Sequence, residues 1–131
     1  MELRIVLVDD NPEYRFLLRQ IIERGTTFSV VGEGWNGEEA IELVDKLEPH
    51  VVVMDIMMPV LGGVEATHVI KERHPGVRVL ALTSSMDESH AEDMSGAGVD
   101  GYFLKNDPVE KLLGQLDSIE LAARSSPLRQ H

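Results

Sequence analysis

The chain has 131 residues and no cysteine, and its 23 acidic against 12 basic side chains give a formal net charge of −11. This length suits a single domain with its own hydrophobic core, and the absence of cysteine excludes disulfide and thiolate chemistry. The negative charge disfavours direct binding to nucleic acid or to anionic membranes. No segment has the length and apolarity of a bilayer span, and no cationic stretch leads an apolar one at the N-terminus, so we expect a soluble, cytoplasmic protein.

Strand-like apolar runs alternate with segments of helical periodicity along the chain. The strand-like runs cover residues 3–8, 28–32, 51–55, 77–82 and 102–104. The helical segments cover residues 12–25, 37–47, 64–73, 87–97 and a last stretch from 108 past 119. Such a repeated alternation predicts an α/β fold in which a parallel sheet, joined by right-handed crossovers, carries helices on both faces.

Sequence signals mark the ends of several expected helices. Asn11 and Pro12 suit an N-cap and a first helical residue, as do Asp107 and Pro108 before the last helix. Asn36 and Glu39 have the spacing of a capping box. The buried face expected for the first helix consists of Tyr14, Leu17, Leu18, Ile21 and Ile22.

Two apolar segments carry less certain signals. Trp35 stands just before the second helix, and we expect it to pack there as a hydrophobic staple rather than to bind a ligand. The fourth helix has a thin apolar face, made of Met86, Ala91, Met94 and Ala97. Because helices are held mainly by packing of an apolar face, this helix is predicted to be the least secure.

Polar or charged residues stand at the ends of four of the five expected strands. Asp9 and Asp10 close the first strand, Asp55 the third, Thr83 the fourth and Lys105 the fifth. Each residue taken alone is better explained as a cap or turn residue than as a functional one. Because the carboxyl ends of parallel strands meet at one edge of the sheet, where open α/β sheets bind ligands, their joint occurrence predicts a functional site.

The residue types at these strand ends favour metal-assisted phosphoryl chemistry. Three carboxylates within a few ångströms repel one another, and a hard divalent cation such as Mg²⁺ relieves that repulsion. One carboxylate oxygen can then attack a phosphoryl group to form an acyl phosphate. Lys105 can neutralise charge on the phosphoryl oxygens, and Thr83 can donate a hydrogen bond to one of them.

In this combination and order, the motifs resemble those of the receiver domain of two-component response regulators. They are the Asp9-Asp10 pair, residues 53–59 (Val-Met-Asp-Ile-Met-Met-Pro) with Gly63 four positions further, Thr83, and residues 101–105 (Gly-Tyr-Phe-Leu-Lys). Residues 77–83 and 100–102 are most similar to receivers whose output domain is a helix-turn-helix DNA binder. The resemblance implies a flavodoxin-like (βα)5 fold of strand order 2-1-3-4-5, with a receiver domain over residues 1–124 and a linker start or disordered tail over 125–131.

The resemblance also implies roles for the acidic residues. Asp55 would be the phosphoacceptor, taking its phosphoryl group from a histidine of a sensor kinase or of a phosphotransfer protein. Asp10 and Asp55 would bind Mg²⁺ directly, Asp9 would act mostly through water, and the backbone carbonyl of Met57 would complete the protein ligands. Such a chain catalyses only its own phosphorylation and dephosphorylation.

A switch and an output face follow from the same resemblance. Thr83 and Lys105 would contact the phosphoryl oxygens, and Tyr102 would change rotamer as Thr83 moves. The ordinary alternative for Tyr102 is a half-buried strand tyrosine with its hydroxyl in water. Signalling, and a homodimer if one forms, would use the face of the fourth helix, fifth strand and fifth helix, with residues 87–98 mobile until phosphorylation.

Some positions depart from the family pattern. Gly62 stands where Asp or Asn is common, which predicts a weak N-cap for the third helix. Asn106 rather than proline follows Lys105, so a cis peptide bond is not expected there. Neither Met57 nor Ser85 offers a carboxylate or amide to orient an attacking water, which predicts slow loss of the phosphoryl group, and small Ser84 should leave the site open.

Three other functions remain open from the sequence. An aspartate-nucleophile phosphatase usually has a second Asp two residues after the first, where this chain has Met57. A flavodoxin-like cofactor binder would share the fold but should hold phosphate with Gly-rich or Ser/Thr-rich loops. A receiver that takes no phosphate would act as a docking module, although the complete set of strand-end residues argues against it.

Overall fold

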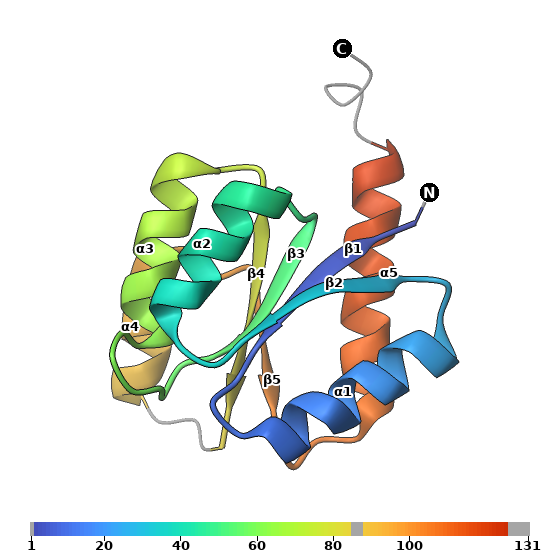
Figure 1. Cartoon of the computed structure of the whole chain (residues 1–131), viewed down its shortest axis with the longest axis horizontal. Coiled ribbons are helices and arrows are strands. Elements are labelled where there is room, and N and C mark those ends of the chain that lie inside the picture. Colours follow the sequence, from blue (N-terminus) through green and yellow to red (C-terminus); the bar gives the residue numbers. More distant parts are fainter. Residues whose placement is uncertain (1, 85–87, 126–131) are drawn as a thin grey trace.

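The computed structural model describes residues 2–84 and 88–125, and of residues 88–90 and 125 it describes the helical backbone alone. The chain folds into a five-stranded parallel sheet of order β2-β1-β3-β4-β5 (Figure 1). The strands are β1 (Arg4–Val8), β2 (Ser29–Gly34), β3 (Val51–Asp55), β4 (Arg78–Thr83) and β5 (Gly101–Leu104). The helices are α1 (Pro12–Gly25), α2 (Gly37–Leu47), α3 (Gly63–Arg73), α4 (Glu88–Ala97) and α5 (Val109–Ser125). The flavodoxin-like α/β fold and the strand order predicted from the sequence are confirmed.

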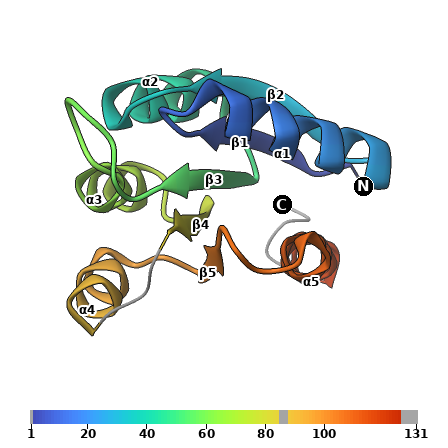
Figure 2. The same cartoon turned by 90° about the horizontal axis from the view of Figure 1, so that it is seen from below.

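The two faces of the sheet are covered by different helices, as Figure 2 shows from below: α1 and α5 lie on one side, and α2, α3 and α4 on the other. Side chains alternate along β3 accordingly, because successive strand residues point to opposite faces. Val51 and Val53 join the core with α1 and α5, whereas Val52 and Met54 join the core with α2 and α3. All five residues of β3 are buried, as its continuous apolar run predicted.

The helix ends follow most of the sequence signals. Asn11 Oδ1 accepts hydrogen bonds from two backbone N–H groups of the first turn of α1. Asn36 caps α2, but Glu39 Oε1 accepts from Trp35 N (2.7 Å) instead of from Asn36, so the capping box is only half formed. Gly62 gives α3 no side-chain cap, as predicted. Helix α5 begins at Val109, one residue after the predicted Pro108, and Lys111 N donates to Pro108 O (3.0 Å) at its first turn.

Two predictions of burial are wrong. Leu17 is 51% exposed, because α1 packs on the sheet through the narrower stripe of Leu18 and Ile22. Trp35 is 55% exposed and does not form a hydrophobic staple. The staple partner in α2 would be Ala40, which is small and already buried against the sheet, so it offers the indole little surface.

Among the described side chains of α4, residues 91–97, those that pack are few, in keeping with the thin apolar face of this helix. Met94 and Ala97 are buried, Ala91 is half-buried, and the small cluster around Met94 includes Ile56 and Ala81. Ser85, Met86 and Asp87 lie outside the described residues. Within the part of the chain that the structure describes, no helix is long and apolar enough to cross a bilayer, and no peptide bond is cis.

Gly63 allows the loop after β3 to fold back on the strand. A Cβ atom at this position would lie 2.3 Å from Asp55 O and 2.7 Å from Ile56 Cα, well inside van der Waals contact. The backbone N–H of Gly63 donates to Ile56 O (3.1 Å). Any larger residue would therefore push against the end of β3 that carries Asp55.

We expect Gly63→Ala to lower the free energy of unfolding by about 1–3 kcal/mol, because the added methyl group overpacks a backbone that cannot move freely. Gly114→Ala is the matched control, since nothing lies within 4 Å of a Cβ atom there. In the exposed interior of α5 that change should stabilise the fold by about 1 kcal/mol. Urea unfolding measures both, and equal effects of the two substitutions would contradict the close approach at Gly63.

Candidate functional site

Acidic side chains from two strand ends meet at the carboxyl edge of the sheet. Asp9, Asp10 and Asp55 each offer one carboxylate oxygen, and these oxygens lie within 4.8 Å of one another. Asp9 and Asp55 are buried, with 1% and 6% of their surface exposed, whereas Asp10 is exposed. Burial of like charges at this spacing is unfavourable unless cations are near.

Lys105 supplies one such cation from the end of β5. Its Nζ lies 2.8 Å from Asp9 Oδ2 and 2.9 Å from Asp55 Oδ2, so the ammonium bridges the first and third strand ends. Its backbone N–H donates to Thr83 O (2.9 Å), which ties the lysine to the end of β4. The ammonium also lies 4.6 Å from the centroid of the Tyr14 ring, which is supplied by α1.

Burial and charge shift the pKa values of this group. Burial raises the pKa of Asp55, and the neighbouring Asp9 carboxylate adds to the rise, while the Met57 N–H and Lys105 oppose it. Burial alone would lower the pKa of Lys105, but hydrogen bonding and charge from Asp9 and Asp55 outweigh it and raise that pKa. Lys105 is therefore charged at neutral pH. For Asp55, the Met57 N–H and Lys105 offset only part of the cost of burying the ionised carboxylate.

The donor set fits a hard divalent cation. Asp9 Oδ1 accepts a hydrogen bond from Asn11 N (2.8 Å), but the buried Oδ2 accepts none of regular geometry from any described residue. Its close neighbour is the Lys105 ammonium, which it shares with Asp55. Three carboxylates against one ammonium leave a net negative charge, and carboxylate oxygens are the ligands that Mg²⁺ prefers.

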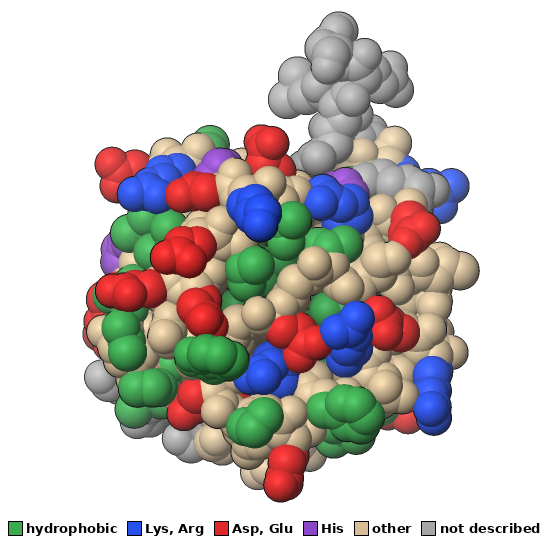
Figure 3. Space-filling view, viewed as in Figure 1, with side chains coloured by type: hydrophobic (Ala, Val, Ile, Leu, Met, Phe, Trp, Pro, Cys, Tyr) green, Lys and Arg blue, Asp and Glu red, His purple; other side chains and the backbone are tan. Residues whose placement is uncertain are grey.

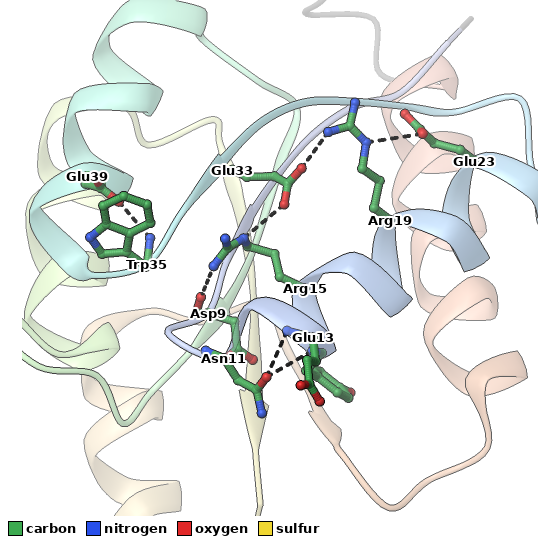
Figure 4. Close-up of polar contacts among 10 residues, drawn as sticks. Asp9, Asn11, Glu13, Arg15, Arg19, Glu23, Glu33, Trp35 and Glu39 are labelled. Atoms are coloured by element: carbon green, nitrogen blue, oxygen red, sulfur yellow. Dashed lines mark hydrogen bonds and ion pairs between the residues drawn. The ribbon is translucent and has the colours of Figure 1, made fainter.

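A polar network from α1 and β2 fixes the backbone of Asp9 (Figure 4). The Arg15 guanidinium donates to Asp9 O (2.6 Å) and to Glu33 Oε1 (2.9 Å). Arg19 holds the other oxygen of Glu33 at 2.5 Å and also contacts Glu23 at 3.3 Å. The Asp9 carbonyl is thus anchored to α1 through Arg15 and, through Glu33, to β2.

The sequence missed the contacts that Arg15 and Tyr14 make with the site. Arg15 and Arg19, four residues apart, lie on one side of α1 and both face Glu33. That spacing was the available signal, since residues four apart share a helix face. No comparable signal was available for the contact between Tyr14 and Lys105.

The other residues predicted for the site are Thr83, Met57 and Tyr102. Thr83 is buried at the end of β4. The Met57 side chain is 67% exposed, and its backbone N–H donates to Asp55 Oδ1 (3.0 Å). Tyr102 is half-buried and packs with the Met94 cluster under α4. Its backbone carbonyl accepts a hydrogen bond from Gln115 of α5 (2.8 Å).

The molecular surface shows no continuous basic patch on the face drawn in Figure 3, where acidic and basic side chains are interspersed among separate apolar patches. This distribution agrees with the excess of acidic residues in the chain. A phosphate backbone would find no extended partner on that face.

The chain is similar to proteins of known type over most of its length. It is 39% identical over 112 residues to the transcriptional regulatory protein DegU of Brevibacillus brevis, covering 86% of this chain and 48% of that one. It is 40% identical over 105 residues to the chemotaxis protein CheY of Halobacterium salinarum, covering 80% and 86%. The chain thus spans about half the length of DegU and most of CheY.

Solved structures and a family model agree with these relatives. A LuxR-family two-component response regulator from Aurantimonas superposes with a TM-score of 0.87 at 35% identity, covering 99% of this chain and 94% of that one. This similarity agrees with the subfamily that the sequence motifs indicated. The family model for the response regulator receiver domain matches residues 5–117, which span β1 through most of α5 and include the acidic cluster and Lys105. The chain therefore belongs to the response regulator receiver domain family.

Proposed function

We propose that this chain is a phosphoacceptor that receives a phosphoryl group on Asp55 from a histidine of a sensor kinase or phosphotransfer protein. The observation that carries the proposal is the position of the Asp55 carboxylate. One oxygen accepts from Met57 N, and the other contacts the Lys105 ammonium, beside two further carboxylates. The carboxylate is thus held in place at the open edge of the sheet, next to the charges that phosphoryl transfer needs.

Mg²⁺ is the cation that the acidic cluster would hold. Asp10 and Asp55 would bind it directly, Asp9 through water, and the Met57 carbonyl would complete the protein ligands. When bound, it offsets negative charge on the carboxylates and on the incoming phosphoryl oxygens. Asp9 Oδ2 shares the Lys105 ammonium with Asp55, and this shared charge supports a further cation on this side of the cluster.

In the proposed transfer, an oxygen of Asp55 forms a bond to phosphorus while the bond from phosphorus to the donor histidine nitrogen breaks. Lys105 neutralises charge on the phosphoryl oxygens as a point charge, and Thr83 donates a hydrogen bond to one of them. The chain acts on no separate substrate and catalyses only its own phosphorylation and dephosphorylation. A cytoplasmic location suits this exchange.

The output face in this proposal consists of α4, β5 and α5. Tyr102, which packs beside Met94, would move together with Thr83 when the phosphoryl group is bound. A homodimer through this face is part of the proposal. Residues 1–124 would form the receiver, and residues 125–131 would be a linker start or a disordered tail. A DNA-binding output domain is part of the proposal, as the length of DegU suggests.

The decisive test is the intact mass of the protein after incubation with Mg²⁺ and a small phosphodonor. Wild type should gain one phosphoryl group, and Asp55→Ala should gain none. Asp117→Ala, an exposed position on α5, is the matched control and should be phosphorylated as wild type is. No adduct on wild type would favour a phosphate-independent docking module, and steady turnover of a phosphate ester would favour a phosphatase.

Removing the charge of Asp55 should stabilise the metal-free protein at neutral pH. Burial raises the pKa of Asp55, so the folded chain holds this proton more tightly than the unfolded chain does. The stability contributed by such a group is complete below its unfolded pKa and is lost as the pH rises through its folded pKa. Asp55→Asn should therefore unfold at higher urea than wild type at neutral pH, with a difference that shrinks on acidification.

The control for that measurement is Asp117→Asn, which makes the same substitution at an exposed position and should not raise the urea midpoint at neutral pH. A chelator keeps divalent cations out of both samples. If Asp55→Asn were less stable than wild type at neutral pH, the proposed destabilisation by the buried charge of Asp55 would be wrong.

We expect the phosphoryl group on Asp55 to persist for many minutes, because the exposed Met57 side chain cannot orient an attacking water. Met57→Asn should shorten that lifetime by supplying an amide. Val60→Asn places an amide on another exposed residue of the same loop, in a left-handed backbone conformation (φ 69°) that Asn tolerates, and should not shorten it. Intact mass at intervals after donor removal measures the decay, and a wild-type lifetime of seconds would contradict the prediction.

A further inference from the structure

Tyr14 contacts the reactive edge of the sheet through Lys105. It stands in the first turn of α1, where its backbone N–H donates to the Asn11 cap (3.1 Å). Its ring is half-buried and packs against the core between α1, α5 and the sheet. The Lys105 ammonium lies 4.6 Å from the ring centroid, within the range of a cation–π contact.

The position of this ring is fixed from two sides. The Asn11 cap sets the first turn of α1, and Asp9 Oδ1 in turn accepts from Asn11 N (2.8 Å). The core contacts of the ring restrict its rotamer. Tyr14 therefore presents the same face to Lys105 as long as the start of α1 is intact.

The described contacts of the Lys105 ammonium differ in how they respond to a ligand. Asp9 and Asp55 are the carboxylates that a divalent cation or a phosphoryl group would engage, so their hold on the ammonium changes when either arrives. The face of a neutral aromatic ring offers no oxygen ligand to Mg²⁺ and no positive charge to a phosphoryl group. Burial raises the pKa of Tyr14, so the ring stays uncharged around neutral pH. The Tyr14 contact is the one that would persist through the reaction.

We infer that Tyr14 is a positioning residue for Lys105: its ring face keeps the ammonium beside Asp55 while the carboxylate partners of the lysine change. The inference rests on the proposed function, since it assigns Tyr14 a role through the lysine of that same site. Tyr14 acts through Lys105 and is assigned no contact with the phosphoryl group. Its ring face, not its hydroxyl, does the positioning, and that distinction makes the inference testable.

Two substitutions separate the ring from the hydroxyl. Tyr14→Phe keeps the ring face, whereas Tyr14→Leu keeps an apolar side chain without one. Phe16→Leu is the matched control, because Phe16 lies on the same helix but is 63% exposed. Urea unfolding of all variants shows whether each one folds at the temperature of the assay.

The first readout is the NMR signal of the Lys105 side chain in the metal-free protein. A ring face above the ammonium shifts the adjacent methylene protons upfield. Wild type, Tyr14→Phe and Phe16→Leu should show that shift, and Tyr14→Leu should lose it. Retention of the shift in Tyr14→Leu would overturn the contact itself, without any reference to phosphorylation.

The second readout is the rate of phosphorylation by a small phosphodonor with saturating Mg²⁺. Loss of a cation–π contact should slow Tyr14→Leu by about 2- to 30-fold, while Tyr14→Phe and Phe16→Leu stay near the wild-type rate. Equal slowing of Tyr14→Phe and Tyr14→Leu would assign the effect to the hydroxyl and overturn the inference, as would a wild-type rate for Tyr14→Leu. Absence of any adduct on wild type would instead overturn the proposed function.

Discussion

The structure depends on how one ammonium group compensates buried carboxylates that repel one another. Lys105 reaches Asp9 and Asp55 at 2.8 and 2.9 Å, and so joins strand ends that belong to β1, β3 and β5. One positive charge cannot satisfy three carboxylates, and Asp9 Oδ2 is left without a regular hydrogen bond among the described residues. The site is thus held together but remains short of positive charge, which is the condition in which a cation binds.

The rest of the fold keeps these charges from moving apart. Strand β3 is buried along its whole length, so Asp55 cannot shift without disturbing both core layers. Gly63 lets the following loop close against the carbonyl of Asp55, and Arg15 holds the carbonyl of Asp9 from α1. Proteins tolerate such unfavourable local arrangements at functional sites because the surrounding structure holds them in place.

The sequence predicted the features that depend on local pattern and on parallel topology. Strand ends gather at one edge of a parallel sheet, so Asp9, Asp55 and Lys105 could be placed together without coordinates. Contacts that depend on how a helix is rotated could not be predicted in this way. The contact of Tyr14 with Lys105 and the exposure of Trp35 both follow from how α1 and α2 sit on the sheet.

The backbone strain at Val60 could not be predicted from the sequence either. Val60 adopts φ 69°, and Leu61 N donates to Pro59 O across it, although a β-branched residue seldom takes this conformation. No propensity rule would place valine there. Val60 lies in the loop between β3 and α3, which folds back toward Gly37. The Gly37 N–H donates to Leu61 O (2.8 Å), next to the strained residue.

The hydrophobic clusters on the two faces of the sheet differ in size. This difference indicates which part of the molecule would respond to a change of charge at the site. The core under α1 and α5 is large and includes Phe103, whereas the buried side chains of the cluster under α4 are Ile56, Ala81 and Met94. Elements with few buried apolar contacts open or shift at lower free energy than the core does. Ile56 directly follows Asp55, and Tyr102 packs on the same cluster. A phosphoryl group on Asp55 would therefore act on this small cluster through Ile56, its immediate neighbour in the chain.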